Sequence, residues 1–385
     1  MSVTTPQGFE AAGVAVGLKS SGKPDVAVVV NRGPRKVGAA VFTSNRAKAN
    51  PIIWSQQVVA DRVVEAVVLN SGGANCFTGD FGFQTTHQTA EKAAELLGVS
   101  AGDVLVCSTG LIGAGDETFR ARVLAGVEAG VAQLSADGGQ SAAEAIMTTD
   151  SVSKTAVFQG DGWSIGGMAK GAGMLAPGLA TMLVVITTDA ELEASEADAA
   201  LRKVTATTFD RLDSDGCMST NDQVTLLANG ASGVHPDFDD FVTGLRTVSE
   251  ELAQKLQGDA EGASHDITIE VRGAVTEEDA VEVGRSVARN NLFKAAIFGN
   301  DPNWGRVLAA IGTTRAEFDP YNVDVFMNDV RVCTAGGPDR PREDVDLTPR
   351  ATSVVIDLKV GDAEAAILTN DLTHDYVHEN SAYAS

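Results

Sequence analysis

Runs of aliphatic and β-branched residues alternate with alanine-rich segments of helical periodicity along this chain. The run Val26–Val30 is apolar at every position and predicts a strand buried on both faces. The predicted strands before residue 190 are Asp25–Val30, Val37–Thr43, Val63–Asn70, Asp103–Cys107, Thr155–Phe158, Trp163–Met168 and Thr181–Thr188. Helical patterns cover Phe83–Leu97, Thr118–Leu134 and Ser195–Phe209. We expect Asp116 to cap the second of these helices and Ser195 the third, because short polar side chains accept the free amide hydrogens of a first turn.

The alternation continues beyond Asp222 and predicts a mixed protein, α/β or α+β. The predicted elements there are strand Gln223–Ala228, helix Asp239–Leu256, strand Ile267–Val271, helix Glu277–Asn291 and β-rich sequence over Tyr321–Leu368. A Gly- and Asp-rich stretch at Gln257–His265 is the clearest change in composition. We therefore expect a domain boundary near residue 270, with an N-terminal domain 1–270 and a smaller C-terminal domain 271–385. Ala335–Arg350 is predicted to be a surface loop.

The length of 385 residues corresponds to about two to three domains. Acidic residues outnumber basic ones by 52 to 29, which gives a formal net charge of −23. Such a charge disfavours binding to nucleic acid or to an anionic membrane surface. The N-terminal sequence lacks the features of a secretory signal, and the apolar run Met182–Ile186 is too short to span a bilayer. These features predict a cytoplasmic protein.

The cysteines and histidines give little sign of a metal site. Four scattered cysteines, Cys76, Cys107, Cys217 and Cys333, form no CxxC pair, and the five histidines form no HExxH motif. We expect no metal and four reduced thiols, with a disulfide between two of them as the alternative. Cys76 and Cys107 lie near sequence motifs described below, so an incidental reactive thiol there stays open.

The most unusual segment is Gly166–Asp189, in which a glycine-rich stretch with one lysine, Lys170, leads into an apolar strand. A phosphate-binding loop is excluded because Lys170 is followed by Gly171 and not by Ser or Thr. Two interpretations remain from the pattern alone. One is an ordinary loop with a solvated lysine. The other is a threonine nucleophile at Thr181, activated when cleavage after Ala180 frees its own α-amine, whose ordinary pKa is about 7.7–8.0.

The same segment resembles the signature of the glutamate/ornithine N-acetyltransferase (ArgJ) family of arginine biosynthesis. Further segments match the family in the same order, so that the resemblance covers essentially the whole chain: 70–75 (NSGGAN), 108–113 (STGLIG), 219–222 (STND), 299–306 (GNDPNWGR) and 380–385 (NSAYAS). The resemblance implies an α+β fold with α/β-type layers, in which DmpA/ArgJ-like β-sheets are sandwiched between helices. It also implies a smaller C-terminal α/β domain whose tail returns to the active site.

The resemblance further implies a precursor that cuts itself between Ala180 and Thr181 into chains 1–180 and 181–385. Thr181 then takes an acetyl group from N-acetylornithine and passes it to glutamate, a ping-pong reaction through an acyl-enzyme that gives ornithine and N-acetylglutamate. Some family members also use acetyl-CoA as donor, and this question stays open here. No cofactor is implied, and the cleaved chains are expected to form an α2β2 heterotetramer.

The resemblance carries over particular site residues. It implies an oxyanion hole made by the Thr109 hydroxyl and the Gly110 backbone N–H. Lys170 is expected to face a substrate carboxylate, and Glu261 to face the ornithine amine or to assist proton transfer. The remaining substrate contacts implied, besides Thr181 itself, are Thr148, Asn380 and Ser385.

Other interpretations stay open at this stage. One is an amidase or aminopeptidase with the same N-terminal threonine, which would release the acyl group to water. Another is a binding protein without catalytic activity. Arg306 could clamp a carboxylate, but we favour a structural role for it beside a core Trp304. Asp213–Gly216 resembles a metal loop but lacks the later glutamate of an EF-hand, and we interpret it as a turn.

Overall fold

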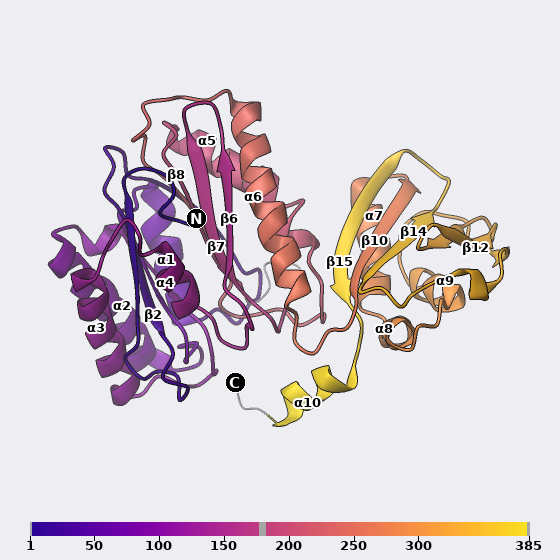
Figure 1. Ribbon diagram of the computed structural model, residues 1–385, viewed down its shortest axis with the longest axis horizontal. Coiled ribbons are helices and arrows are strands. Elements are labelled where there is room, and N and C mark those ends of the chain that lie inside the picture. Colours follow the sequence, from indigo (N-terminus) through magenta and orange to yellow (C-terminus); the bar gives the residue numbers. More distant parts are fainter. Residues whose placement is uncertain (1, 177–181, 383–385) are drawn as a thin grey trace.

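The computed structural model of this protein describes residues 2–176 and 182–382. Helices and three β-sheets make up this part of the chain, which confirms the predicted α+β class. Two of the sheets lie together in a larger body that contains the N-terminus, and the third forms a smaller lobe (Figure 1).

The first sheet contains the early strands of the chain in the spatial order β1-β2-β4-β5. Its strands are β1 (Phe9–Val14), β2 (Val26–Asn31), β4 (Ala66–Asn70) and β5 (Val104–Ser108). Strands β4 and β5 are parallel, with Asn70 opposite Ser108, so their carboxyl ends lie side by side. The helices that belong to this half are α1 (Asn50–Val58), α2 (Gly79–Leu97), α3 (Glu117–Ala132) and α4 (Gly139–Ala145).

The second sheet has the order β3-β9-β8-β7-β6 and combines strands from both sides of the glycine-rich segment. Its strands are β3 (Val37–Phe42), β6 (Lys154–Gln159), β7 (Ser164–Lys170), β8 (Leu183–Thr188) and β9 (Gln223–Ala228). Two helices follow its strands, α5 (Ala194–Thr205) and α6 (Phe238–Gly258). Strands β8 and β9 are parallel, with Leu183 opposite Gln223.

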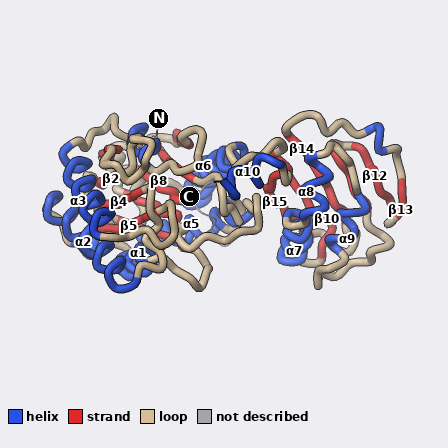
Figure 2. Tube along the Cα trace, turned by 90° about the horizontal axis from the view of Figure 1, so that it is seen from below, coloured by secondary structure: helices blue, strands red, loops and turns tan. Residues whose placement is uncertain are grey.

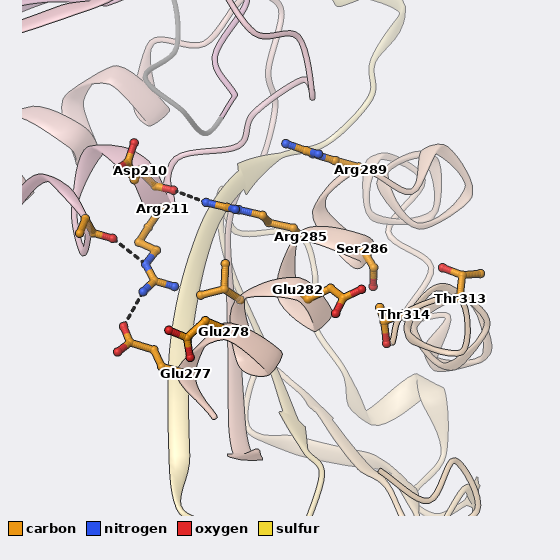
Figure 3. A pocket seen from close by; sticks show the side chains of 12 residues that line it. Asp210, Arg211, Glu277, Glu278, Glu282, Arg285, Ser286, Arg289, Thr313 and Thr314 are labelled. Carbon is orange, nitrogen blue, oxygen red and sulfur yellow. Dashed lines mark hydrogen bonds and ion pairs between the residues drawn. The ribbon is translucent and has the colours of Figure 1, made fainter. Parts of the chain in front are cut away.

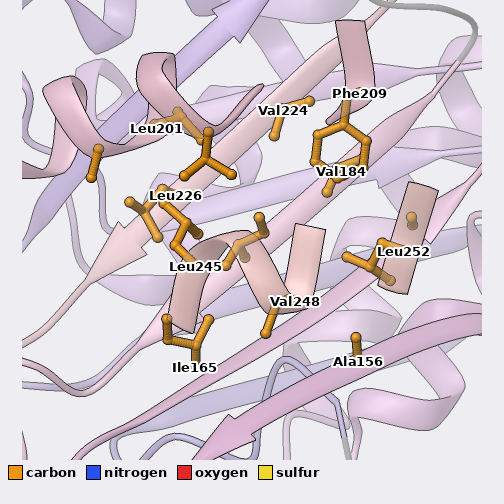
Figure 4. Close-up of a cluster of buried hydrophobic side chains, with 14 of the residues drawn as sticks. Ala156, Ile165, Val184, Leu201, Phe209, Val224, Leu226, Leu245, Val248 and Leu252 are labelled. Atoms are coloured by element: carbon orange, nitrogen blue, oxygen red, sulfur yellow. The ribbon is translucent and has the colours of Figure 1, made fainter. Parts of the chain in front are cut away.

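The valine-rich strands are apolar on both faces because each of the first two sheets lies between two cores. In β2, Ala27 and Val29 point into a core shared with the second sheet, whereas Val28 and Val30 pack against α2 and α3. The second sheet is built in the same way, and its outer face packs against α5 and α6 (Figure 4). The body is therefore a pair of sheets sandwiched between helices, as the family resemblance implies.

The third sheet begins at Asp266 and has the order β13-β12-β11-β14-β10-β15. Its strands are β10 (Asp266–Ala274), β11 (Asp324–Met327), β12 (Val330–Thr334), β13 (Gly337–Pro338), β14 (Ala351–Asp357) and β15 (Ala363–Asn370). A separate hydrophobic core joins this sheet to α7 (Glu277–Ala288), α8 (Asn291–Phe298) and α9 (Trp304–Ile311). The predicted boundary at residue 270 lies within β10, and the division into two domains stays a prediction.

The last helix, α10 (His374–Ala382), leaves the third sheet and runs back toward the larger body (Figures 1 and 2). The described chain also contains short 3-10 turns at Val59–Asp61, Ala101–Asp103, Phe209–Arg211 and Arg342–Asp344. The last of these turns and strand β13 lie in the stretch 335–350 that we predicted to be a loop.

One of the two predicted helix caps is confirmed and the other is wrong. Asp116 caps α3, since its side chain accepts a hydrogen bond of 2.8 Å from the backbone N–H of Phe119. Helix α5 begins one residue earlier than predicted, and Glu193 caps it in place of Ser195. The side chain of Glu196 accepts from the Glu193 N–H at 2.8 Å, which completes a reciprocal capping box. The side chains of Glu193 and Glu196 thus cap the helix in place of the Ser195 hydroxyl that we predicted.

Candidate active site

The carboxyl ends of β4 and β5 position the predicted oxyanion hole. The Thr109 N–H donates to the Asn70 carbonyl at 2.9 Å, and the Gly73 N–H donates to the Thr109 carbonyl at 3.0 Å. The Ser108 hydroxyl donates to the Asn70 side-chain oxygen at 2.6 Å, which ties the two strand ends together. Thr109 is consequently buried and held on both sides by backbone hydrogen bonds.

Gly110 occupies a backbone position that only glycine fits. Its φ is +122°, and a Cβ there would lie 2.6 Å from the Gly73 nitrogen and 2.7 Å from the Gly72 carbonyl carbon. No oxygen among the described residues accepts a hydrogen bond from the Gly110 N–H or from the Thr109 hydroxyl. Two neighbouring donors are thus open, and the oxyanion hole that the resemblance implies at this position stays a prediction.

Lys170 is the last residue of β7, and its side chain is buried with 1 % exposed. Its ammonium Nζ lies 3.4 Å from the Thr109 hydroxyl oxygen and 3.9 Å from a carboxylate oxygen of Asp150. The interpretation of Lys170 as a solvated loop lysine is therefore wrong. Burial lowers the pKa of this lysine, and the negative charge of Asp150 opposes that effect.

Asp150 connects the segments around Lys170, although we did not predict it as a site residue. Its carboxylate accepts from the backbone N–H groups of Gly171 at 2.7 Å and Thr148 at 3.0 Å, and from Lys154 Nζ at 2.7 Å. Burial alone would raise the pKa of Asp150. The nearby Lys170 and Lys154 outweigh burial and lower that pKa to about 2. Asp150 lies two positions after the predicted contact Thr148, but nothing in the sequence showed that Lys154 would pair with it.

The predicted substrate contact Thr148 follows α4 and lines a cavity of about 660 Å³. Gly110, Asp150 and Lys19 line the same cavity. The Lys19 ammonium donates to the Met147 carbonyl at 3.0 Å, so it is held at the cavity wall. The structure thus places Gly110 and Thr148 on the wall of one cavity, and Asp150, on the same wall, lies 3.9 Å from the Lys170 ammonium that contacts Thr109.

Glu261 and Asn380 form a second pair, next to the first group. The Asn380 side-chain amide donates to a Glu261 carboxylate oxygen at 3.0 Å, so α10 contacts the loop after α6. The Glu261 N–H donates to the Ala172 carbonyl at 2.9 Å, and its carboxylate lies against Gly173, where a Cβ would be 2.4 Å away. Segment 170–173 therefore links Glu261 to Lys170.

Three predicted site residues, Ala180, Thr181 and Ser385, lie outside the described residues. The described chain resumes at Met182, whose N–H donates to the Asp222 carboxylate at 3.1 Å. The parallel register of β8 and β9 explains this contact, because it places the residues just before the two strands side by side. Asp222 is fully buried, and burial raises its pKa well above the ordinary value. It belongs to a motif we had quoted, but we assigned it no role.

The remaining candidates have structural surroundings. Trp304 is half-buried against the third-sheet core, and the Arg306 guanidinium donates to the Leu292 carbonyl, which agrees with the structural role that we favoured. Residues 214–216 form a bend, and Asp213 just before them pairs with Arg289 at 2.7 Å. All four cysteines are free, and burial raises the pKa of Cys107. Within the described ranges, no cluster of His, Cys, Asp or Glu could hold a metal ion.

A second cavity, of about 680 Å³, lies elsewhere, between the turn that follows α5 and helix α7 (Figure 3). Its arginines are engaged in internal contacts. Arg211 pairs with Glu277 at 2.5 Å, and Arg285 donates to the Asp210 carbonyl at 2.9 Å. The cavity contains none of the predicted site residues. Among the helices of the described chain, none has the length and apolarity needed to cross a membrane.

The layered fold places two open donors, on Thr109 and Gly110, beside a buried lysine, an arrangement that suits an enzyme of acyl transfer. Residues 10–385 match the model of the ArgJ family. A relative from Streptomyces coelicolor, named arginine biosynthesis bifunctional protein ArgJ, is 62 % identical over 385 residues, with all of both chains covered. A protein of the same name from Thermobifida fusca is 58 % identical, again with full coverage.

A solved structure of ornithine acetyltransferase with ornithine from Mycobacterium tuberculosis is 48 % identical, with a TM-score of 0.44. It covers 47 % of this chain and 96 % of its own. The family match and the full-length relatives establish that the chain belongs to the ArgJ family. They confirm the predicted acetyltransferase of arginine biosynthesis, and neither the amidase nor the non-enzymatic interpretation is favoured.

Proposed function

We propose that this chain moves the acetyl group of N-acetylornithine to glutamate through an acetyl ester on Thr181. The observation that carries the proposal is the grouping of two open donors, on Thr109 and Gly110, with the buried Lys170 ammonium 3.4 Å from the Thr109 hydroxyl. The donors suit the oxyanion of a tetrahedral intermediate. The lysine suits the carboxylate that N-acetylornithine and glutamate share.

Self-cleavage supplies the nucleophile in this proposal. Thr181 Oγ adds to the Ala180 carbonyl, the peptide C–N bond breaks, and the released nitrogen takes the hydroxyl proton. Water then hydrolyses the ester, leaving chains 1–180 and 181–385. The new α-amine of Thr181, with an ordinary pKa of about 7.7–8.0, can accept the hydroxyl proton in the transfer reaction.

The transfer consists of two balanced half-reactions. In the first, Thr181 Oγ attacks the acetyl carbonyl while the Thr181 amine takes its proton. The bond to the ornithine nitrogen breaks, and that nitrogen receives the proton as ornithine leaves. In the second, the glutamate amine attacks the acetyl ester, gives up a proton and leaves as N-acetylglutamate, while Thr181 Oγ is protonated again. The Thr109 and Gly110 donors stabilise the oxyanion in both halves.

The substrate contacts in this proposal follow from the two groups of residues. Lys170 binds the α-carboxylate, with Thr148 at the wall of the adjoining cavity. Glu261 binds the ornithine ammonium, and Asn380 holds the Glu261 carboxylate from α10. The predicted contact of the terminal Ser385 stays a prediction.

Steady-state kinetics with both substrates test the reaction. We expect ornithine and N-acetylglutamate in equal amounts and parallel double-reciprocal lines. Intersecting lines would mean a ternary complex, and acetate in place of N-acetylglutamate would mean a hydrolase. Replacing N-acetylornithine by acetyl-CoA in the same assay decides whether acetyl-CoA is a co-substrate. No other cofactor is proposed.

Thr181→Ala tests the nucleophile. The variant should remain one uncut chain and show no transfer, because it lacks the attacking oxygen. Thr181→Ser is the matched variant, since it keeps a hydroxyl and should retain cleavage. Transfer by Thr181→Ala at the wild-type rate would contradict the proposed role.

We further propose that the two cleaved chains stay together in an α2β2 heterotetramer located in the cytoplasm. Light scattering of the purified protein measures the assembly. A mass equal to one precursor would contradict it.

A further inference from the structure

In the proposed function, one site must accept two side chains of opposite charge, and the residues discussed so far do not explain how. Donor and acceptor place their α-nitrogen at the same threonine in turn, so their side chains enter the same part of the site. The ornithine side chain ends in an ammonium, whereas the glutamate side chain ends in a carboxylate. A subsite lined by charges of only one sign would favour one substrate and reject the other.

A cavity of about 220 Å³ beside Glu261 has walls of both signs. Asp215, Asp371 and Glu261 line it together with Lys294 and Arg289. The cavity adjoins the segment that leads to residue 177. The Met174 N–H donates to the Asp215 carboxylate at 2.8 Å, and the Ser214 N–H donates to the Leu175 carbonyl at 2.6 Å.

Lys294 is the unusual member of this cavity. It lies on α8 with 5 % of its surface exposed, and its ammonium donates to the Ser214 carbonyl and, at 3.4 Å, to the Thr369 hydroxyl. No carboxylate oxygen of the described chain lies within 4.0 Å of that ammonium. By contrast, the buried Lys154 pairs with Asp150 at 2.7 Å and with Asp259 at 2.5 Å.

A buried ammonium without a carboxylate partner is costly, because desolvation is not repaid by a close opposite charge. Lysines in such positions often mark functional sites. Burial lowers the pKa of Lys294 to about 8, which still leaves the group mostly charged at neutral pH. The nearby carboxylates of Asp215, Asp213 and Asp371 limit that shift.

We infer that Lys294 is a specificity-determining residue that binds the side-chain carboxylate of glutamate in this cavity. Glu261, with Asp215 behind it, holds the ornithine ammonium when the donor is bound. The cavity accepts each substrate in turn because each side chain meets its opposite charge. The inference rests on the proposed function and assigns its acceptor site.

Lys294→Met tests the inference, because it keeps the length of the side chain and removes the charge. We expect the KM for glutamate to rise about 10- to 100-fold, the loss expected for one charge-assisted hydrogen bond. Exchange of labelled ornithine into N-acetylornithine, which uses the same threonine without glutamate, should stay within about twofold of wild type. Lys294→Arg should restore most of the glutamate affinity.

Lys203→Met is the matched control, since Lys203 is exposed on α5 and pairs with Asp239 at 3.6 Å. It should leave both assays unchanged. An unchanged KM for glutamate in folded Lys294→Met protein would overturn the inference. An equal loss of glutamate transfer and ornithine exchange would also overturn it, because it would show a purely structural lysine. Failure of wild-type protein to exchange ornithine would instead refute the proposed function.

Discussion

Gly110→Ala is the perturbation that tests the oxyanion hole with the least ambiguity. Two separate costs follow from the structure. An alanine at φ +122° is strained by about 1–3 kcal/mol. Its Cβ would also meet backbone atoms of Gly72 and Gly73 at 2.6–2.9 Å, and the resulting shift adds about 1–3 kcal/mol. The free energy of unfolding should therefore fall by about 2–6 kcal/mol in total.

Gly113→Ala is the control that separates the effect of backbone strain from the loss of the oxyanion donors, because Gly113 lies in the same loop as Gly110. Its φ is +84°, and a Cβ there would meet nothing within 4 Å. The free energy of unfolding of this variant should fall only by the cost of the strain, about 1–3 kcal/mol. Its acetyl transfer should stay near wild type, because the displaced N–H groups are those of Gly110 and its neighbours and not of Gly113.

The assay is acetyl transfer from N-acetylornithine to glutamate, measured for each variant at a temperature below its own unfolding transition. Gly110→Ala should lower kcat about 10²- to 10³-fold, the usual loss for one oxyanion-hole donor. Urea unfolding of the same samples gives the stability change. Equal kcat values for folded Gly110→Ala and Gly113→Ala would refute the assignment of Gly110 to the oxyanion hole.

Three further changes test the surroundings of the site. Asp150→Asn removes the carboxylate whose negative charge keeps the pKa of Lys170 from falling further. The pKa of Lys170 should therefore drop in this variant. The KM for N-acetylornithine should rise, most at high pH, because Lys170 is then neutral. The folded pKa of Asp150, about 2, lies below the ordinary value of about 3.9, so its ionisation stabilises the fold above pH 4. About 2–3 kcal/mol should be lost as pH falls from 4 toward 2, and urea unfolding of Asp150→Asn should lack this part. Asn380→Ala removes the contact with Glu261 and should raise the KM for N-acetylornithine severalfold, whereas an unchanged KM would separate α10 from the site.

The layered core was predictable because its signal is local. An apolar run such as Val26–Val30 requires cover on both faces, and the structure supplies a second sheet on one side and helices on the other. Short helices were harder to predict. Helices α1, α4, α8 and α9 have too few residues for a clear period. Strand β1 was missed because its sequence, FEAAGV, is mostly small residues and has no β-branched run. Helix α7 was predicted to reach Asn291, but it ends at Ala288 and α8 begins at Asn291.

The site was predicted by resemblance and not by pattern. The pattern alone allowed Lys170 to be a solvated residue, because nothing in the neighbouring sequence shows that β7 carries its side chain into the interior. Its environment depends on contacts between distant segments, such as Lys154 with Asp259, 105 positions apart. Lys294 had no signal at all, since one lysine in a helix is usually exposed. Only the packing of α8 against Ser214 and Thr369 reveals that it is buried.

Intact-mass spectrometry of the purified protein after incubation with N-acetylornithine alone tests the central claim most directly. The account predicts two chains, 1–180 and 181–385, with one acetyl group on the second chain, and loss of that group when glutamate is added. A single uncut chain, or a cut chain that never carries the acetyl group while transfer proceeds, would contradict an acetyl-threonine intermediate.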